Sequence, residues 1–204
     1  MKRWIIAAIF AFGSAAPASA QSWQSFLKNA LQALTGKTDE TETAAAAASG
    51  FPAAQELLGT WTYRAPAMEY TGSDMLASLA TSTLKGQLPS YYQQAGLQSG
   101  TGTIVFDRND AFRAVLTEHR LEGTYSYDAA TGTVTIRCPL DSRSVCFTGS
   151  AKLAEGVLTM LFEANAVLAS LQALPQYAQN EKLQQISTIL QNYPGVMLGA
   201  ELTR

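Results

Sequence analysis

The chain has 204 residues, of which 47% are hydrophobic, and a formal net charge of −2. A chain of this length can form one domain with a hydrophobic core. Its 14 lysine and arginine residues are not gathered into a basic cluster, which argues against a nucleic-acid-binding protein.

The first 20 residues, MKRWIIAAIFAFGSAAPASA, have the three parts of a secretory signal peptide. Lys2 and Arg3 form a positive start, an apolar run follows, and Ala18-Ser19-Ala20 is a small-residue cleavage site. A retained anchor is the alternative, but the apolar run is short for a bilayer. We therefore expect cleavage after Ala20, a periplasmic or secreted protein, and no transmembrane segment in the mature chain. Loss of Lys2 and Arg3 changes the net charge from −2 to −4.

Two segments precede the predicted domain. Residues 21–36 predict an amphipathic helix, because apolar side chains recur on one helical face before Gly36, a plausible C-cap. Residues 37–55 are polar and then alanine-rich, which predicts a linker. The helix either folds back onto the domain or binds a partner.

The predicted domain, residues 56–204, begins with two aromatic and β-branched runs, GTWTY and AMEYT, which Pro66 separates. This pattern predicts a bent or interrupted edge strand. Apolar residues spaced three to five apart over 73–96 then predict a helical insert, with Ser73 as the N-cap.

Three hairpins are predicted between residues 101 and 163. Their strand pairs are TGTIVF with AFRAVLTE, EGTYSYD with TVTIRC, and SVCFTGSAKL with VLTMLFE. A second helical insert over 164–193 precedes a last strand, VMLGAELT. We expect a mainly β fold with some α content, in which about eight antiparallel strands close into a barrel as the last strand pairs with the first. An open sheet covered by helices on one face is the alternative.

The chain has two cysteines, Cys138 and Cys146, in RCPLDSRSVC. A close pair in an oxidising compartment predicts a disulfide across the hairpin. Two free thiols are the alternative.

Five stretches in order resemble an uncharacterised family of secreted bacterial lipocalin-like domains of the calycin type. They are LLGTWTYRAPAMEY, YYQQAGLQSGTGTIVF, GTYSYDAATGTVTI, LTMLFEANAVL and YPGVMLGAEL. Within the first, Gly59-Thr60-Trp61 looks like the Gly-x-Trp signature of lipocalins and fatty-acid-binding proteins. The resemblance implies that Gly59 and Trp61 are structural, and that Trp61 points inward at a closed end and packs on an arginine. Arg137 and Arg204 are the candidates. The cysteine hairpin and the two long inserts depart from the family pattern.

No catalytic or metal-binding constellation is recognisable in the sequence. The one histidine, His119, lies between Glu118 and Arg120 without a nucleophile motif. One histidine and two cysteines are too few ligands for zinc. The segment DRNDAFRAVLTE lacks the oxygen ligand and the glycine that a calcium loop requires. We therefore expect a protein that is not an enzyme and needs no metal or other cofactor.

A lipocalin-like barrel implies binding of a small hydrophobic molecule or lipid in its cavity. Strand alternation and side-chain size select six candidate ligand-contacting residues: Trp61, Phe106, Phe112, Tyr125, Met160 and Phe162. In the alternative, the barrel is filled by its own side chains and serves as a structural module or interacts with a protein of the cell envelope.

Overall fold

A computed structural model of the protein describes residues 50–74, 97–116, 119–140, 143–172 and 193–204, with isolated positions between 75 and 96 and between 173 and 192. The predicted signal peptide, the helix at 21–36 and the linker as far as residue 49 lie outside these residues. Helix α2 (Ala54–Leu57) includes the last two residues of the predicted linker.

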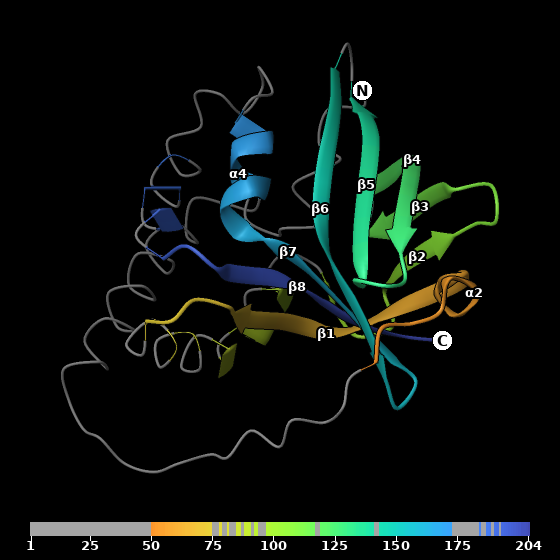
Figure 1. Ribbon diagram of the computed structural model, residues 1–204, viewed down its shortest axis with the longest axis horizontal. Coiled ribbons are helices and arrows are strands. Elements are labelled where there is room, and N and C mark those ends of the chain that lie inside the picture. Colours follow the sequence, from red (N-terminus) through yellow and green to blue (C-terminus); the bar gives the residue numbers. More distant parts are fainter. Residues whose placement is uncertain are drawn as a thin grey trace.

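Eight strands form a closed antiparallel barrel in which each strand pairs with its neighbours in the chain (Figure 1). They are β1 (Gly59–Tyr70), β2 (Gly102–Phe106), β3 (Ala111–Leu116), β4 (His119–Asp128), β5 (Thr133–Leu140), β6 (Arg143–Ala154), β7 (Val157–Glu163) and β8 (Val196–Thr203). Strand β8 pairs with β1, from Thr203 opposite Thr62 to Val196 opposite Tyr70. The sheet therefore has no free edge, and the predicted closure is confirmed in place of the open sheet.

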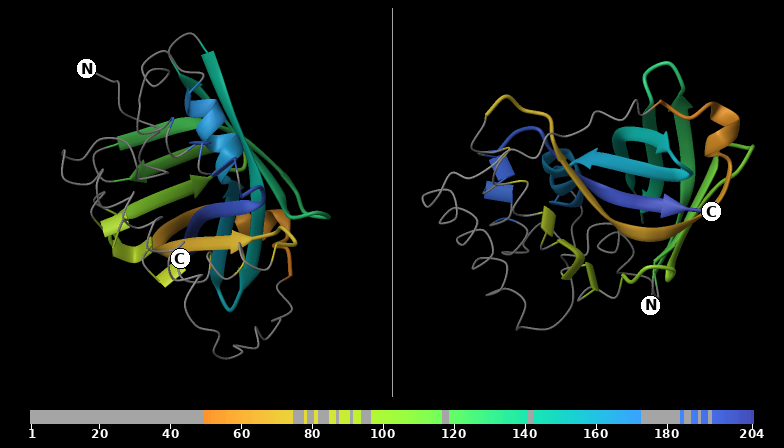
Figure 2. Two further views of the ribbon diagram at one scale, coloured as in Figure 1. Left: turned by 90° about the vertical axis from the view of Figure 1, so that its left-hand side faces the viewer. Right: turned by 90° about the horizontal axis from the view of Figure 1, so that it is seen from below.

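The first strand is one continuous element, where the sequence predicted a bent or interrupted strand. A register shift between Tyr63 and Ala65 marks a bulge, and beyond it Pro66 lies opposite Ala200 on β8. A bulge bends a strand without ending its pairing. Figure 2 shows the resulting curvature of β1, which carries the strand past two different neighbours, β2 and then β8.

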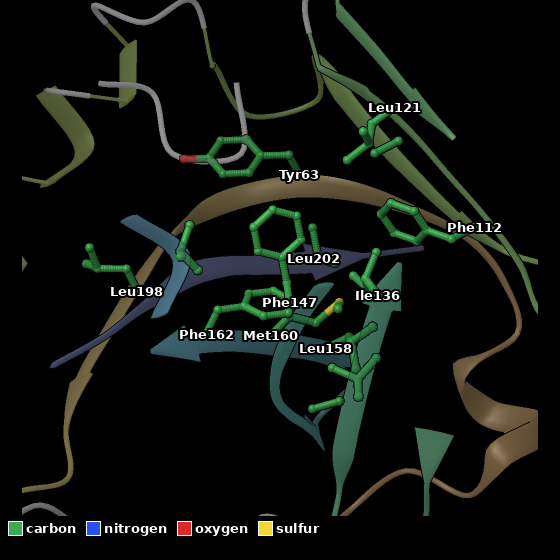
Figure 3. Close-up of a cluster of buried hydrophobic side chains, with 14 of the residues drawn as sticks. Tyr63, Phe112, Leu121, Ile136, Phe147, Leu158, Met160, Phe162, Leu198 and Leu202 are labelled. Atoms are coloured by element: carbon green, nitrogen blue, oxygen red, sulfur yellow. The ribbon is translucent and has the colours of Figure 1, made fainter. Parts of the chain in front are cut away.

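Apolar residues alternate with polar ones along the strands, and the apolar set fills the barrel interior. On β5, Val134, Ile136 and Cys138 are buried, whereas the residues between them are half-buried or exposed. Figure 3 shows this interior cluster, to which Phe147, Leu158 and eight further labelled side chains contribute from the surrounding strands. The period of two is that of a sheet with one buried face.

The two predicted inserts contain helical residues. In the first, the described positions between 78 and 93 are helical, and Leu88 and Tyr92 are buried. The second begins with α4 (Ala164–Gln172), which lies beside β6 (Figures 1 and 2) and buries Val167 and Leu168. No described helix has the length and apolar character that crossing a membrane would require.

The predicted disulfide between Cys138 and Cys146 is wrong, because both cysteines are free. In the β5–β6 hairpin, Cys138 lies opposite Val145 and Cys146 lies opposite Arg137. This offset of one residue places the two side chains on opposite faces of the sheet. Cys138 is fully buried inside the barrel and Cys146 is exposed outside it. Burial, and to a smaller extent Cys146, raises the pKa of the Cys138 thiol to about 12.

Candidate functional site

One end of the barrel is closed by the residues around Trp61. The indole Nε1 of Trp61 donates a hydrogen bond to the Leu57 carbonyl oxygen at 2.8 Å. The guanidinium of Arg204 lies over the ring, with Cζ 4.6 Å from its centroid, and donates to the carbonyl oxygens of Glu56 and Leu58. Of the two candidate arginines, Arg204 therefore packs on the tryptophan. Both figures of the whole chain show the C-terminus beside α2.

Gly59 provides the turn from α2 into β1. Its φ of 115° is a conformation that residues with a side chain rarely adopt. The chain can thus reverse between Leu57, whose carbonyl holds the indole, and Trp61, which enters the barrel. This is why a glycine stands two residues before the tryptophan.

An aromatic cluster fills the lumen next to the closed end. The Phe106 ring centroid lies 5.6 Å from that of Phe112 and 4.8 Å from that of Tyr125, in tilted and edge-on arrangements. The Tyr125 hydroxyl donates to the Asp107 carbonyl oxygen at 3.0 Å, so its polar group is satisfied outside the cluster. Edge-on aromatic pairs pack densely, and this part of the barrel is structural core.

Beyond this cluster the barrel contains an apolar cavity of about 50 Å³. Its lining combines apolar side chains, two tyrosines and two small residues of β8: Tyr63, Tyr92, Leu97, Ile104, Phe112, Ile136, Met160, Phe162, Gly199, Ala200 and Leu202. Figure 3 shows Phe112, Ile136, Met160, Phe162 and Leu202 directed into this region. The small side chain of Ala200 leaves part of this space free, because a larger side chain at that position would occupy it.

The side of the cavity away from Trp61 is covered by Tyr92, which belongs to the first helical insert. The Tyr92 hydroxyl donates to the Gly199 carbonyl oxygen at 3.1 Å. Its ring stacks on Tyr63 with centroids 6.1 Å apart and planes 11° from parallel. Desolvation raises the pKa of Tyr92, and the neighbouring Tyr63 raises it further. Tyr92 is therefore held in place both by a hydrogen bond and by ring stacking.

The structure separates the six predicted ligand-contacting residues into two groups. Phe112, Met160 and Phe162 line the cavity. Trp61, Phe106 and Tyr125 lie in the packed closed end. Strand alternation could have found several lining residues that are missing from the six predicted ones, because they lie on the same inward face of the barrel sheet. These are Tyr63, Ile104, Ile136 and Leu202. No strand pattern points to Tyr92, which comes from the insert.

The structure brings no metal-binding group together in the part of the chain that it describes. There, no three or more His, Cys, Asp or Glu side chains are placed to hold an ion. Acidic and basic side chains of the described residues meet in ion pairs on or near the surface, such as Arg113 with Asp107 at 3.8 Å. What the cavity offers chemically is apolar contact area.

An antiparallel eight-stranded barrel, closed at one end by a tryptophan and an arginine and containing an apolar cavity, defines a lipocalin-like protein. The chain belongs to the family described as "Lipocalin-like domain (DUF4923)", which matches residues 31–204. The family resemblance seen in the sequence is thereby confirmed, and the match begins before the predicted domain start at residue 56. Comparisons with curated proteins and with solved structures each gave no match.

Proposed function

We propose that this protein binds a small hydrophobic molecule or lipid in the barrel cavity. The observation that carries the proposal is a lumen that is closed at the Trp61 end and lined by apolar and tyrosine side chains around a free volume. Binding there would transfer apolar ligand surface out of water, which yields about 25 cal/mol per Å² before the costs of ordering.

The free volume sets a condition on this proposal. The cavity of about 50 Å³ is small beside the roughly 300–1,000 Å³ of pockets that hold drug-sized ligands. A larger ligand therefore requires a lining side chain to move. Tyr92 can do so because, like Leu97, it lies outside the barrel strands, and its large ring covers one side of the cavity. We propose that it swings away from Gly199 and Tyr63 when the ligand enters.

The size of the cavity also favours a second candidate function. If the lumen stays filled, the barrel is a structural module or an interaction module of the cell envelope, with no small-molecule ligand. In that case Tyr92 is a permanent part of the core, and its hydrogen bond to Gly199 serves stability alone.

To decide between the two functions, the full-length gene would be expressed and the protein purified without detergent. Native mass spectrometry and solvent extraction would detect a co-purifying apolar molecule. Titration with the neutral hydrophobic dye N-phenyl-1-naphthylamine would measure access to the lumen through the rise in dye fluorescence. We expect a bound molecule, or saturable dye binding after its extraction.

A matched pair of variants locates the binding. Ala200 lines the cavity, whereas Ala111 lies on β3 outside the lining. Ala200→Leu should fill part of the cavity and weaken dye binding about tenfold or more, because the dye could then bury less of its apolar surface there. Ala111→Leu should leave the dye affinity unchanged. Protein that carries no apolar molecule and never binds dye would favour the filled barrel instead.

We further propose that the protein is exported to the periplasm or beyond, with residues 1–20 removed. The support is the charged start, the apolar run and the Ala18-Ser19-Ala20 site. The intact mass of protein recovered from the periplasmic fraction should correspond to a chain that begins at Gln21. A cytoplasmic protein that retains Met1 would contradict export.

A further inference from the structure

We infer that the ligand is a single-chain amphiphile whose unsubstituted hydrocarbon end enters the cavity, while its polar group stays outside, on the side of Tyr92. A chain that carries a polar group at both ends is disfavoured. This inference rests on the proposed binding function and adds the chemical class of the ligand and the direction in which it binds.

The first argument is the chemistry of the cavity wall. All the surface that the lining residues present to the cavity is apolar. Tyr63 and Tyr92 therefore face it with ring carbon atoms, and the Tyr92 hydroxyl is bound to the Gly199 carbonyl oxygen at 3.1 Å. A hydroxyl or carboxyl group placed in such a space would lose its hydrogen bonds to water and gain none in return. A methyl or methylene group has none to lose, and an apolar cavity stays dry and accepts apolar atoms.

The second argument is the backbone around the cavity, whose polar groups are engaged in the closed sheet. Ile104 on β2 is paired with Trp61 on β1 and with Ala114 on β3. Met160 on β7 is likewise paired with a strand on each side. Backbone N–H and C=O groups in a sheet bond to the neighbouring strands, so these lining strands direct side chains at a ligand. A polar group of the ligand would find this backbone already paired.

The third argument is the size and direction of the space. The cavity of about 50 Å³ is smaller than the roughly 150 Å³ of an engineered apolar cavity that takes up benzene, so it has room for a short chain end and not for a whole lipid. Trp61 and Phe106 pack the closed end, which leaves the side covered by Tyr92 for the rest of the chain. Hydrogen-bonding groups, the Tyr92 hydroxyl and the Gly199 carbonyl oxygen, lie on that side. The polar group of the ligand therefore lies there, outside the apolar wall.

The test compares 1-dodecanol with 1,12-dodecanediol as competitors of N-phenyl-1-naphthylamine. The two chains have the same length, but the alcohol has a hydrocarbon end and the diol has none. We expect the diol to bind at least about tenfold more weakly, because its second hydroxyl would be buried without a partner.

A diol is also better hydrated than an alcohol, so a pair of variants isolates the contribution of the cavity. Ala200→Ser places a hydroxyl in the lining, where it can pair with the second hydroxyl of the diol. The preference for dodecanol over the diol should then fall about threefold or more. Ala111→Ser, on β3 outside the lining, is the matched control and should leave that preference unchanged. Circular dichroism checks the fold, and Ile104→Thr, which places a hydroxyl elsewhere in the lining, takes the place of Ala200→Ser if that variant does not fold.

The outcomes distinguish this inference from the proposed function. Absence of dye and dodecanol binding would overturn the binding function itself. Dye binding that neither chain displaces, or that both displace with equal affinity, would overturn only the ligand class. A preference for dodecanol that a hydroxyl in the lining does not reduce would overturn the placement of the chain end in the cavity.

Discussion

The guanidinium carbon of Arg204 lies 4.6 Å from the centre of the Trp61 ring, so the last residue of the chain covers the third residue of its first strand. The same two residues hold α2, through the indole bond to Leu57 and the guanidinium bonds to Glu56 and Leu58. Three elements, α2, β1 and the C-terminus, therefore meet at one point. The closed end is fixed by side chains as well as by the pairing of β1 with β8.

Removing the guanidinium should loosen this closed end. Arg204→Ala is expected to lower the free energy of unfolding by about 1–3 kcal/mol, through loss of a cation–π contact and of hydrogen bonds to α2. Urea denaturation followed by circular dichroism measures the change. The control is Arg137→Ala on the exposed outer face, which should shift stability by less than about 0.5 kcal/mol. Equal effects of the two variants would contradict the role of Arg204.

Gly59→Ala isolates the backbone contribution of the turn before Trp61. A Cβ at Gly59 would meet no atom within 4 Å, so any loss of stability comes from the φ of 115° alone. We expect a loss of at least about 1 kcal/mol. Gly50→Ala also adds a Cβ in open space, at a residue without positive φ, and should be neutral or slightly stabilising. Comparing the two urea midpoints provides the measurement, and a neutral Gly59→Ala would refute the requirement for glycine.

The two thiols should react very differently with a thiol reagent. Cys146 is exposed and Cys138 is fully buried, with a pKa raised to about 12. We expect one rapidly labelled thiol in the folded, unreduced protein and two after unfolding, because the thiolate is the reactive form. Cys146→Ser should abolish the rapid labelling, whereas Cys138→Ser should leave it intact. A folded protein without any reactive thiol would indicate the disulfide after all.

The cysteine pair illustrates which features the sequence could and could not reveal. Strand alternation located the β5–β6 hairpin, but register depends on the turn, and here Leu140 pairs directly with Arg143. With this turn, the residue numbers of two paired residues in the hairpin always differ by an odd number. Cys138 and Cys146 differ by eight, so they cannot lie opposite each other. The register was not readable from spacing alone, and it decides the face of every side chain.

The cavity-lining residues likewise divide into those that the sequence could reveal and one, Tyr92, that it could not. Phe112, Met160 and Phe162 were predictable because they alternate on strands whose direction and neighbours the hairpins define. Tyr92 was not, since its position depends on how an insert folds over the barrel. Its contacts with Gly199 and Tyr63 are long-range ones, which no local pattern encodes.

Tyr92 should make the protein sensitive to alkaline pH. Burial, followed by the effect of Tyr63, raises the pKa of Tyr92 above its ordinary value of 10.0. Below about pH 10 tyrosine is protonated in both states, so its contribution is fully present. Above that pH the unfolded tyrosine ionises while the folded one stays protonated. Stability then falls by about 1.4 kcal/mol per pH unit for this group.

The variant Tyr92→Phe tests this directly, with urea denaturation at a series of pH values from neutral to strongly alkaline. At neutral pH the variant should be about 1 kcal/mol less stable than the wild type, because the hydrogen bond to Gly199 is lost. Above about pH 10 the variant lacks one ionising group, so its stability falls less steeply and the two curves converge. Curves that stay parallel throughout would show that Tyr92 ionises as readily in the folded barrel as in the unfolded chain, and would contradict its burial against Tyr63 and Gly199.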